Sequence, residues 1–234
     1  MSEQYNDKII LTKDEIEKCI EDFDKIDKLK YDEAAVKMVF EKLSNNKIEE
    51  VLPKVIVLND RYGTQLHSNE RLTKNDSEQR TNRKMVFDVQ TISKVIINRK
   101  FADLKNDCES IRNWIVDTIN HISQEYPHYR IPYSFLSKYS AWSFQEQNIP
   151  ILDSFAKGML YELNEQTKYY SQSSIIKSKM NDYNYYCEIY DAFVNHVKRN
   201  IGEYNYKSID KYLWFYGKYR LFLNEKNSID IRLY

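Results

Sequence analysis

Glycine and proline are scarce in this sequence, with four of each among 234 residues. Turns between β-strands rely on these two residue types, so their scarcity argues against a many-stranded β protein and favours helices. No apolar run approaches the roughly 18 residues of a membrane-spanning helix. The polar N-terminus, MSEQYNDK, lacks the apolar region of a signal peptide. We therefore expect a helical, cytoplasmic protein with no membrane partner.

Motifs that indicate a metal or a cofactor are also lacking. The three cysteines, Cys19, Cys108 and Cys187, lie far apart and make no zinc-binding spacing. Glycine-rich phosphate loops, paired histidines at metal-ligand spacing and the Gly-x-Ser-x-Gly elbow of hydrolases do not occur in the sequence. We expect buried free thiols in a reducing compartment, with no metal and no cofactor.

Charge balance and tyrosine content limit the classes of molecule that this protein is expected to bind. Basic and acidic residues balance at 35 each, so any affinity for nucleic acid must arise from a local basic patch. Tyrosine is abundant, with 20 residues. Because its side chain joins a large apolar ring to a polar hydroxyl, the tyrosine-rich C-terminal half is expected to be a packing region or a surface for a protein partner. A biased genomic base composition is the alternative explanation.

Apolar residues recur at helical spacing along most of the chain. They predict an all-α, compact multi-helix bundle in one domain, residues 1–234. Residues Thr12 and Glu15 match a capping box, Asp32 is the expected N-cap of the second helix, and Gly63 is expected to end the third. The predicted helices cover residues 12–26, 32–43, 48–58, 85–98, 104–122, 133–144, 171–199 and 209–223, with a further helix that opens on Asp153.

A polar segment, residues 68–84, interrupts this pattern. It contains five basic and three acidic side chains and a single large apolar residue, Leu72. Loops of this length in compact domains are usually functional or disordered. We expect a solvated loop that divides two sub-lobes, residues 1–67 and 85–234, with contact to nucleic acid as the alternative.

Residues 131–163 carry the main functional signal. They predict an apolar helix over 133–144, a polar turn over 145–148, a proline-bearing step over 149–152 and a second helix that opens on Asp153. An aspartate at this position can act as an N-cap, accepting backbone N–H groups near Phe155 and Ala156. It can also stabilise a cationic transition state or take a proton from a nucleophile. Both roles remain open from the sequence.

This succession resembles the core of the helix-hairpin-helix DNA glycosylase superfamily. In that family an apolar helix leads to a Pro-Val-Asp step whose aspartate is catalytic, and Pro150 to Asp153 would be that step with one extra residue. The resemblance covers about residues 32–165. It implies a helix-hairpin-helix glycosylase-like fold, DNA as partner and a hydrolase that removes a base, with Asp153 as the catalytic residue.

The sequence departs from the family pattern at two places. The family's hairpin has glycines that let backbone N–H groups approach a DNA phosphate, whereas residues 130–134 contain none. Members that use a lysine nucleophile carry it just after the hairpin. That place is near Ser134 here, and Lys138 reaches it only if the intervening helix is about a turn shorter. Lys138 is therefore either a second catalytic residue or an exposed surface lysine, and the fold can have survived without its activity.

Other residues of this region fit DNA binding. The resemblance places Arg130, His128 and Ser134 near a phosphate, and Tyr133 and Trp142, with Tyr139 and Phe144, where an extruded base could stack. The alternative is that His128 and Arg130 are merely solvated and that the aromatic residues form core.

Two further functions remain open. Arg61 and His67, six positions apart, resemble the signature of HEPN-type ribonucleases, in which an arginine stabilises phosphate charge and a histidine performs acid–base cleavage of RNA. The third reading is a non-enzymatic α-helical scaffold that binds a protein partner.

Overall fold

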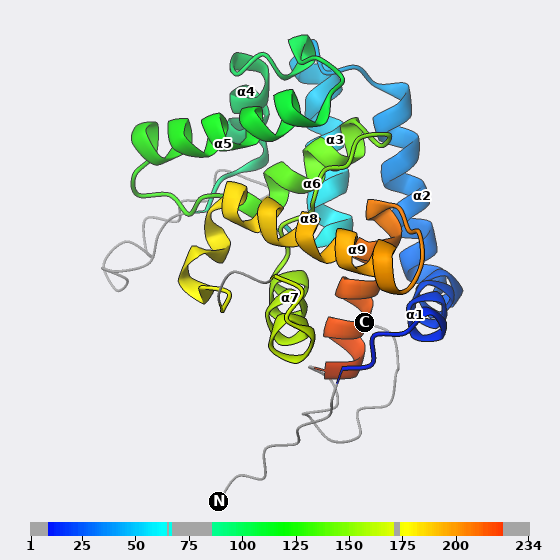
Figure 1. Cartoon of the computed structure of the whole chain (residues 1–234). Helices are drawn as coiled ribbons and strands as arrows, with labels where there is room; N and C mark the ends of the chain where they lie inside the picture. The colour runs from blue at the N-terminus through cyan, green and yellow to red at the C-terminus, as the bar shows by residue number, and fades with distance from the viewer. Residues whose placement is uncertain (1–8, 65, 67–85, 171–173, 222–234) are drawn as a thin grey trace, which may run out of the picture. The chain divides into compact units, whose positions relative to one another are not determined.

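Helices make up almost all of the regular structure in the computed structural model, which describes residues 9–64, 66, 86–170 and 174–221 (Figure 1). No β-strand occurs among these residues, so the all-α prediction is confirmed. The α-helices are α1 (Lys13–Lys25), α2 (Asp27–Lys42), α3 (Ile48–Tyr62), α4 (Val89–Asn98), α5 (Cys108–Glu125), α6 (Tyr133–Ser143), α7 (Ser154–Thr167), α8 (Tyr183–Asn200) and α9 (Tyr206–Phe215). Short 3-10 helices, η1 (Phe101–Asp103) and η2 (Lys177–Asn181), and a π-helix, η3 (Tyr216–Leu221), complete the set.

The chain divides into two compact units. The central unit is Lys28–Ile149, and the terminal unit combines Met1–Asp27 with Pro150–Tyr234. The predicted loop, residues 68–84, lies outside the described residues, and the segments on both of its sides belong to the central unit. The single domain over 1–234, with sub-lobes 1–67 and 85–234, therefore stays a prediction.

In the central unit, α3 packs against α4 and α6, and α5 packs against α6. Phe101 of η1 lies at the centre of its aromatic core, with ring centroids 4.6 Å from Trp114 and 5.2 Å from Tyr139. The indole N–H of Trp114 donates to the carbonyl oxygen of Arg99 over 2.9 Å, so this buried donor is satisfied.

In the terminal unit, α1 packs against α9, and α7 packs against α8, α9 and η3. In Figure 1, α1 is blue because it lies near the start of the sequence, and α9 is orange because it lies near the end. Phe23 of α1 contacts Trp214 of α9, with ring centroids 5.8 Å apart. At the same interface the Lys211 ammonium lies 2.7 Å from the Asp24 carboxylate. This interface therefore joins residues that are 187 positions apart in the sequence.

Local capping signals explain most helix ends. The Thr12 hydroxyl accepts the backbone N–H of Glu15 over 3.2 Å, as the capping box predicts. Gly63 follows α3 with φ of 54°, the left-handed conformation that glycine adopts at low cost. Both predicted caps are confirmed.

Three predicted boundaries are wrong. Asp32 lies inside α2, which already begins at Asp27, and its carboxylate meets Arg61 instead of capping a helix. The segment predicted as one helix from residue 171 becomes helical in η2, and α8 begins at Tyr183 because Asp182 accepts the N–H groups of Asn184 and Tyr185. The last predicted helix changes from α9 into η3 after Phe215. The predicted extended tail, residues 229–234, lies outside the described residues.

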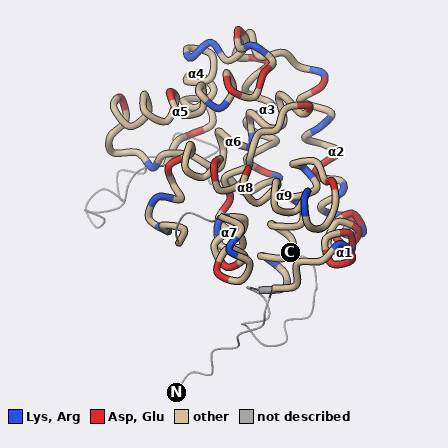
Figure 2. Tube along the Cα trace, in the orientation of Figure 1, with Lys and Arg blue, Asp and Glu red and all other residues tan. Residues whose placement is uncertain are grey.

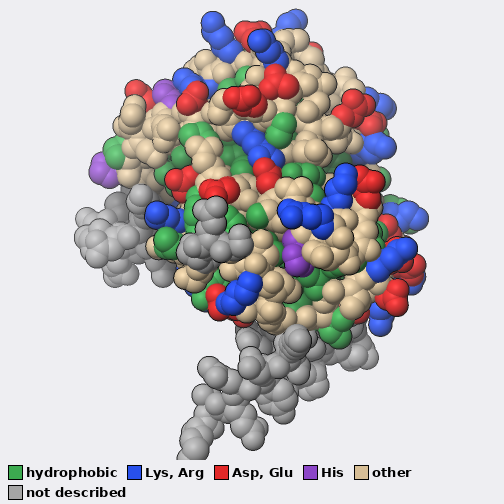
Figure 3. All heavy atoms as spheres, viewed as in Figure 1, with side chains coloured by type: hydrophobic (Ala, Val, Ile, Leu, Met, Phe, Trp, Pro, Cys, Tyr) green, Lys and Arg blue, Asp and Glu red, His purple; other side chains and the backbone are tan. Residues whose placement is uncertain are grey.

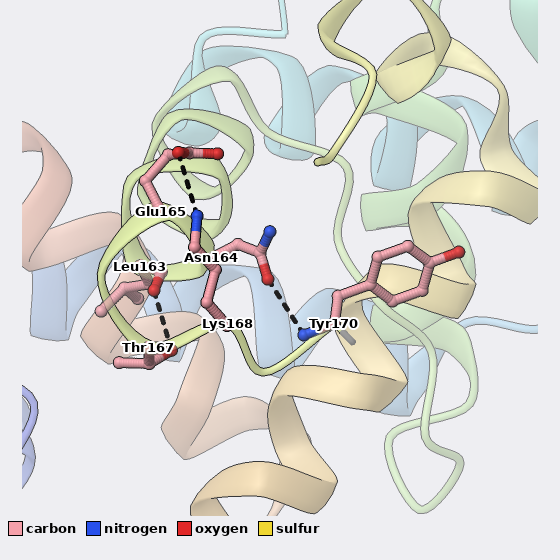
Figure 4. A network of polar contacts seen from close by, with 6 residues as sticks. All are labelled: Leu163, Asn164, Glu165, Thr167, Lys168 and Tyr170. Atoms are coloured by element: carbon pink, nitrogen blue, oxygen red, sulfur yellow. Dashed lines mark hydrogen bonds and ion pairs between the residues drawn. The ribbon is translucent and has the colours of Figure 1, made fainter. Parts of the chain in front are cut away.

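Helix α7 ends in a polar cap (Figure 4). Lys168 adopts a left-handed φ of 52°, and its N–H bonds to the carbonyl oxygen of Asn164. The side chain of Asn164, only 1% exposed, accepts the backbone N–H of Tyr170 over 2.9 Å. The Thr167 hydroxyl donates to the carbonyl oxygen of Leu163. These bonds stop the helix and turn the chain away from it.

Charges of both signs are dispersed over the described helices. Figure 2 shows that α1 is the most acidic of them, and Figure 3 shows basic and acidic side chains interspersed on the drawn face. No helix in the described part of the chain is long and apolar enough to span a membrane.

Candidate functional site

Asp153 is the N-cap of α7. Its backbone is extended, with φ of −122° and ψ of 151°, and one carboxylate oxygen accepts the backbone N–H of Phe155 over 2.9 Å. The side chain is buried, with 8% of the residue exposed. The predicted helix over 133–144, the turn and the helix that opens on Asp153 are all present as α6, the linking segment and α7. The capping role is therefore real, and it fixes the direction of the carboxylate.

The proline step before Asp153 is held by two buried tyrosines of α8. The Tyr183 hydroxyl donates to the carbonyl oxygen of Pro150 over 2.8 Å, and the Tyr186 hydroxyl donates to that of Ile151 over 2.6 Å. An extended segment has no helical partners for its carbonyl groups, so these hydroxyls supply the bonds that burial requires. The backbone is thus fixed on both sides of Asp153, by the two tyrosine hydroxyls before it and by helix α7 after it.

The hydroxyl of Tyr186 remains protonated at neutral pH. Burial raises the pKa of Tyr186 well above its ordinary value, and the nearby Tyr190, Asp210 and Asp153 add to that rise. The Asp153 carboxylate therefore lies close enough to Tyr186 for its charge to act on the phenol. This tyrosine is a donor at every pH at which the protein would work.

Asp153 caps its helix in a different way from two other aspartate caps, Asp88 and Asp107, and more in the way of Asp182, which also accepts backbone N–H groups through one carboxylate oxygen. Asp88 and Asp107 each use both carboxylate oxygens, one for a backbone N–H and one for a hydroxyl, of Thr91 and Ser110 respectively. The residue at the equivalent place after Asp153 is Ala156, which has no hydroxyl. Asp153 is buried, whereas Asp88 and Asp107 are half-buried, and the residue three positions after it has no hydroxyl that could donate to its carboxylate.

The structure places Lys138 in the interior of the central unit. This residue of α6 is 5% exposed, and its ammonium lies 5.7 Å from the centroid of the Tyr62 ring. The alternative expectation, an exposed surface lysine, is wrong, because residues 135–140 of α6 are all buried. Lys138 belongs to the central unit, whereas Asp153 belongs to the terminal unit.

The predicted DNA-binding residues of α6 divide into two groups. Tyr133 and Ser134, in its first turn, are half-buried. Trp142 is buried, with its ring 6.0 Å from that of Tyr62 and 6.4 Å from that of Phe40. Tyr139 is fully buried. Trp142 and Tyr139 are therefore core residues of the central unit in this structure.

His128 and Arg130, the predicted phosphate contacts, are exposed on the loop between α5 and α6. Aromatic packing anchors this loop, because the rings of Tyr126 and Tyr129 lie 5.2 Å and 4.7 Å from that of buried Phe87. The loop without glycine is thus held by aromatic contacts, while its two basic side chains remain accessible.

A buried lysine that the sequence pattern did not indicate lies in α3. Lys54 is 1% exposed, and its ammonium donates to the side-chain oxygen of Asn45 over 2.9 Å and lies 5.1 Å from the centroid of the Phe40 ring. The same oxygen accepts the hydroxyl of Tyr139 over 2.7 Å. Burial lowers the pKa of Lys54 to about 8. Its position three residues after buried Val51 was the available signal.

The ribonuclease pair is only partly described. Arg61 lies at the end of α3, where its guanidinium is 3.3 Å from the Asp32 carboxylate and 3.3 Å from that of Asp60. His67 lies outside the described residues.

Two of the three cysteine thiols are buried, and metal-binding side chains do not cluster in the described residues. The described segments contain no group of three or more His, Cys, Asp or Glu that could hold a metal ion. All three cysteines are free; Cys19 and Cys187 are buried, whereas Cys108 is partly exposed. Burial raises the pKa of the Cys19 thiol to about 12, so it is not a nucleophile at neutral pH.

Comparison with known proteins gives a family for the chain. The family HI_0787_N, described as an N-terminal domain, matches residues 15–147, more than half of the sequence. The chain belongs to this family. No curated protein and no solved structure matches it. The match ends two residues before the central unit does, at Ile149. Lys54, Lys138 and the loop with His128 and Arg130 therefore lie in the family's domain, whereas Asp153 follows it.

Proposed function

We propose that this protein binds DNA and removes a base from it, as a glycosylase-like hydrolase. In this proposal the Asp153 carboxylate stabilises the oxocarbenium-like charge that develops on the sugar as the base–sugar bond breaks, and it activates the water that attacks the sugar carbon.

The observation that carries the proposal is the setting of Asp153. Its carboxylate is buried at the start of α7, behind a step whose carbonyl groups are held by Tyr183 and Tyr186. A fixed negative charge in a poorly solvated place interacts more strongly with a developing cation than the same charge in water. The order of α6, turn, proline step and α7 adds the resemblance to the glycosylase core.

The proposal assigns the attack to water and not to Lys138. A lysine nucleophile must reach the sugar, whereas Lys138 is 5% exposed and its ammonium faces the Tyr62 ring. We therefore expect no covalent lysine–sugar intermediate, and borohydride should trap no protein–DNA complex.

A base-excision assay on a panel of lesion-bearing duplexes tests the proposal. Wild type should release a base, and Asp153→Asn should lose at least a hundredfold in rate because it removes the charge while keeping the shape. Asp182→Asn is the matched control, since Asp182 is also an aspartate N-cap in the terminal unit, at the exposed start of α8. Its activity should equal that of wild type.

Two results would contradict the glycosylase proposal. One is excision that Asp153→Asn leaves unchanged; the other is no excision of any lesion in a broad panel. RNA cleavage that His67→Ala abolishes and Asp153→Asn does not affect would favour the ribonuclease. A stable protein partner, with neither activity present, would favour the scaffold.

A further inference from the structure

Helix α2 has apolar side chains on two opposite faces. Val36 and Phe40 lie on its inner face and are 0% and 7% exposed. Tyr31 and Met38 lie on the opposite side, because a helix turns by about 100° per residue, and they are 67% and 52% exposed. Ala34, which is also exposed, lies between them on the same side. We refer to Tyr31, Ala34 and Met38 as the outer stripe.

The outer stripe differs from the other exposed large apolar residues of the described chain. Ile10, Ile56 and Ile176 are 52%, 46% and 44% exposed, but each lies on a different segment. Single exposed apolar residues are ordinary on a protein surface. Residues of the stripe recur at positions i, i+3 and i+7, which is the spacing by which one helix packs along another. The stripe therefore has the pattern that a helical partner requires.

Lysines border the outer stripe on both sides. Lys28 and Lys42 lie along one edge, Lys30 and Lys37 lie along the other, and all four residues are exposed. In the described part of the chain, Lys28, Lys30 and Lys42 form no ion pair with a carboxylate, whereas the Lys37 ammonium lies 3.7 Å from the Glu41 carboxylate. An exposed pair of this kind contributes little, so both of its charges remain accessible to a partner.

The acidic residues of α2 do not cancel this positive charge. Asp32 and Glu33 lie toward the buried side, where the Asp32 carboxylate is 3.3 Å from Arg61 and Glu33 is half-buried. Asp27 and Glu41 lie on the outer side, near the two ends of the helix. Four lysines and these two acids leave the outer half of α2 with a net charge of +2, and lysines stand on both edges of the stripe.

The same charges disfavour a second copy of this chain as the partner. In an antiparallel pair of α2 helices, Lys28 of one copy faces Lys42 of the other, and Lys30 faces Lys37. In a parallel pair, Lys37 lies near Lys42 of the other copy. Like charges at such positions repel, so both arrangements are opposed. A helix with carboxylates beside its apolar face would instead meet a lysine along either edge.

We propose that the outer stripe docks an amphipathic helix of a protein partner, with acidic residues along both edges of the partner's apolar face. Tyr31 and Met38 would pack against that face, since tyrosine and methionine are enriched in protein interfaces. The small Ala34 between them lets the two helix axes approach closely. This inference is independent of the glycosylase proposal, because the stripe belongs to the central unit and Asp153 to the terminal unit.

Fluorescence anisotropy of a labelled peptide, titrated with the full chain, tests the proposal. The probe is a designed monomeric helix with leucine on one face and glutamate along both edges of that face. Its twin has lysine in place of every glutamate. The acidic peptide should bind at least about tenfold more tightly than the basic twin. Its affinity should fall as KCl is raised, because salt screens exposed ion pairs.

The substitution Met38→Gln tests the apolar contact. Glutamine keeps the helix propensity of methionine but lacks its apolar end, so the variant should bind the acidic peptide at least about fivefold more weakly. Ile56→Gln is the matched control, since Ile56 is an exposed apolar residue of the same unit, on α3. Its affinity should stay within about twofold of that of wild type. Circular dichroism verifies that both variants are folded.

The double substitution of Lys30 and Lys42 by glutamine tests the charged edges, with one lysine changed on each. This variant should bind the acidic peptide at least about threefold more weakly, and KCl should affect its binding less. The control changes Lys94 and Lys105 to glutamine, which removes the same charge from exposed lysines elsewhere in the central unit. It should bind as wild type does.

Three outcomes would overturn the proposal. The first is equal affinity for the two peptides, or an acidic peptide that Met38→Gln binds as tightly as wild type. The second is a dimer in sedimentation that Met38→Gln dissociates, which would assign the stripe to a second copy. The third is binding to phosphatidylserine vesicles that Met38→Gln abolishes, with neither peptide bound, which would assign the stripe to a lipid surface.

Discussion

The hydroxyl of Tyr186 donates a hydrogen bond of 2.6 Å to the carbonyl oxygen of Ile151. The donor lies in α8 and the acceptor two residues before Asp153, so one bond links the interior of the terminal unit to the proposed site. Since the phenol is fully buried, its loss would leave the backbone acceptor without the partner that the fold supplies.

Tyr186→Phe should destabilise the protein by about 1–3 kcal/mol, the cost of an unsatisfied group in the interior. Urea unfolding monitored by circular dichroism measures the change. Tyr204→Phe is the control, because the Tyr204 hydroxyl makes a long, 3.4 Å bond to Glu17 at the surface and its loss should cost less than about 0.5 kcal/mol. Equal stability of the Tyr186 variant and wild type would mean that the bond contributes nothing.

Substitutions at Asp153 should separate capping from catalysis. Asparagine caps helices about as well as aspartate, so Asp153→Asn should retain stability to within about 0.5 kcal/mol, whereas Asp153→Ala should lose about 1 kcal/mol. Thermal melts of the two variants, measured beside their excision rates, check this. An asparagine variant as unstable as the alanine variant would show that the charge itself holds the fold.

The buried Lys54 predicts a dependence of stability on alkaline pH. Its pKa falls from 10.5 to about 8 on folding, so between these values the unfolded chain binds the proton more tightly than the folded one. The penalty of burying the charge is complete below pH 8 and disappears as pH rises toward 10.5. Wild type should therefore gain up to about 3 kcal/mol relative to Lys54→Met across this range. Urea unfolding of both proteins at pH 7.5, 9 and 10.5 measures the difference, and parallel pH profiles would contradict it.

Close packing between η3 and α7 predicts a steric effect. A Cβ added at Gly217 would lie 3.0 Å from the Met159 side chain and 3.2 Å from the carbonyl oxygen of Phe155. Gly217→Ala should therefore cost about 1–3 kcal/mol. At Gly202 the nearest atom, in the Tyr204 ring, is 3.4 Å away, so Gly202→Ala should be neutral or slightly stabilising. Melting temperatures of the two variants, compared with wild type, measure the effect, and a Gly217→Ala variant as stable as wild type would contradict the steric prediction.

The sequence predicted the features that depend on neighbouring residues. Helical periodicity indicated where most helices lie, and the caps at Thr12, Gly63 and Asp153 are short-range signals that the backbone follows directly. Asp32 was misread because an aspartate near a helix start also suits an ion pair, and its partner, Arg61, is 29 residues away. The residues next to Asp32 in the sequence contain no information about an ion-pair partner that lies so far along the chain.

The buried lysines Lys54 and Lys138 also could not be predicted from neighbouring residues in the sequence. Lysine is usually exposed, so neither Lys54 nor Lys138 was expected inside. Both are enclosed by aromatic rings from other helices, Phe40 and Tyr62, whose positions depend on the packing of the whole central unit. The tyrosine-rich half was expected to be core or a partner surface. Its residues Tyr183, Tyr186, Tyr190 and Tyr212 are buried, so a protein partner there stays a prediction that other side chains would have to support.

The pairing of α1 with α9 has a consequence for biosynthesis. On the ribosome, α1 emerges nearly 200 residues before the helix whose Lys211 meets its Asp24. The central unit needs no such delay, because its contacts fall within Lys28–Ile149. During synthesis the apolar face of α1, with Ile16, Cys19 and Phe23, therefore lacks its packing partner and remains exposed to solvent until α9 leaves the exit tunnel. A nascent chain of this protein would offer a chaperone one early and persistent binding segment.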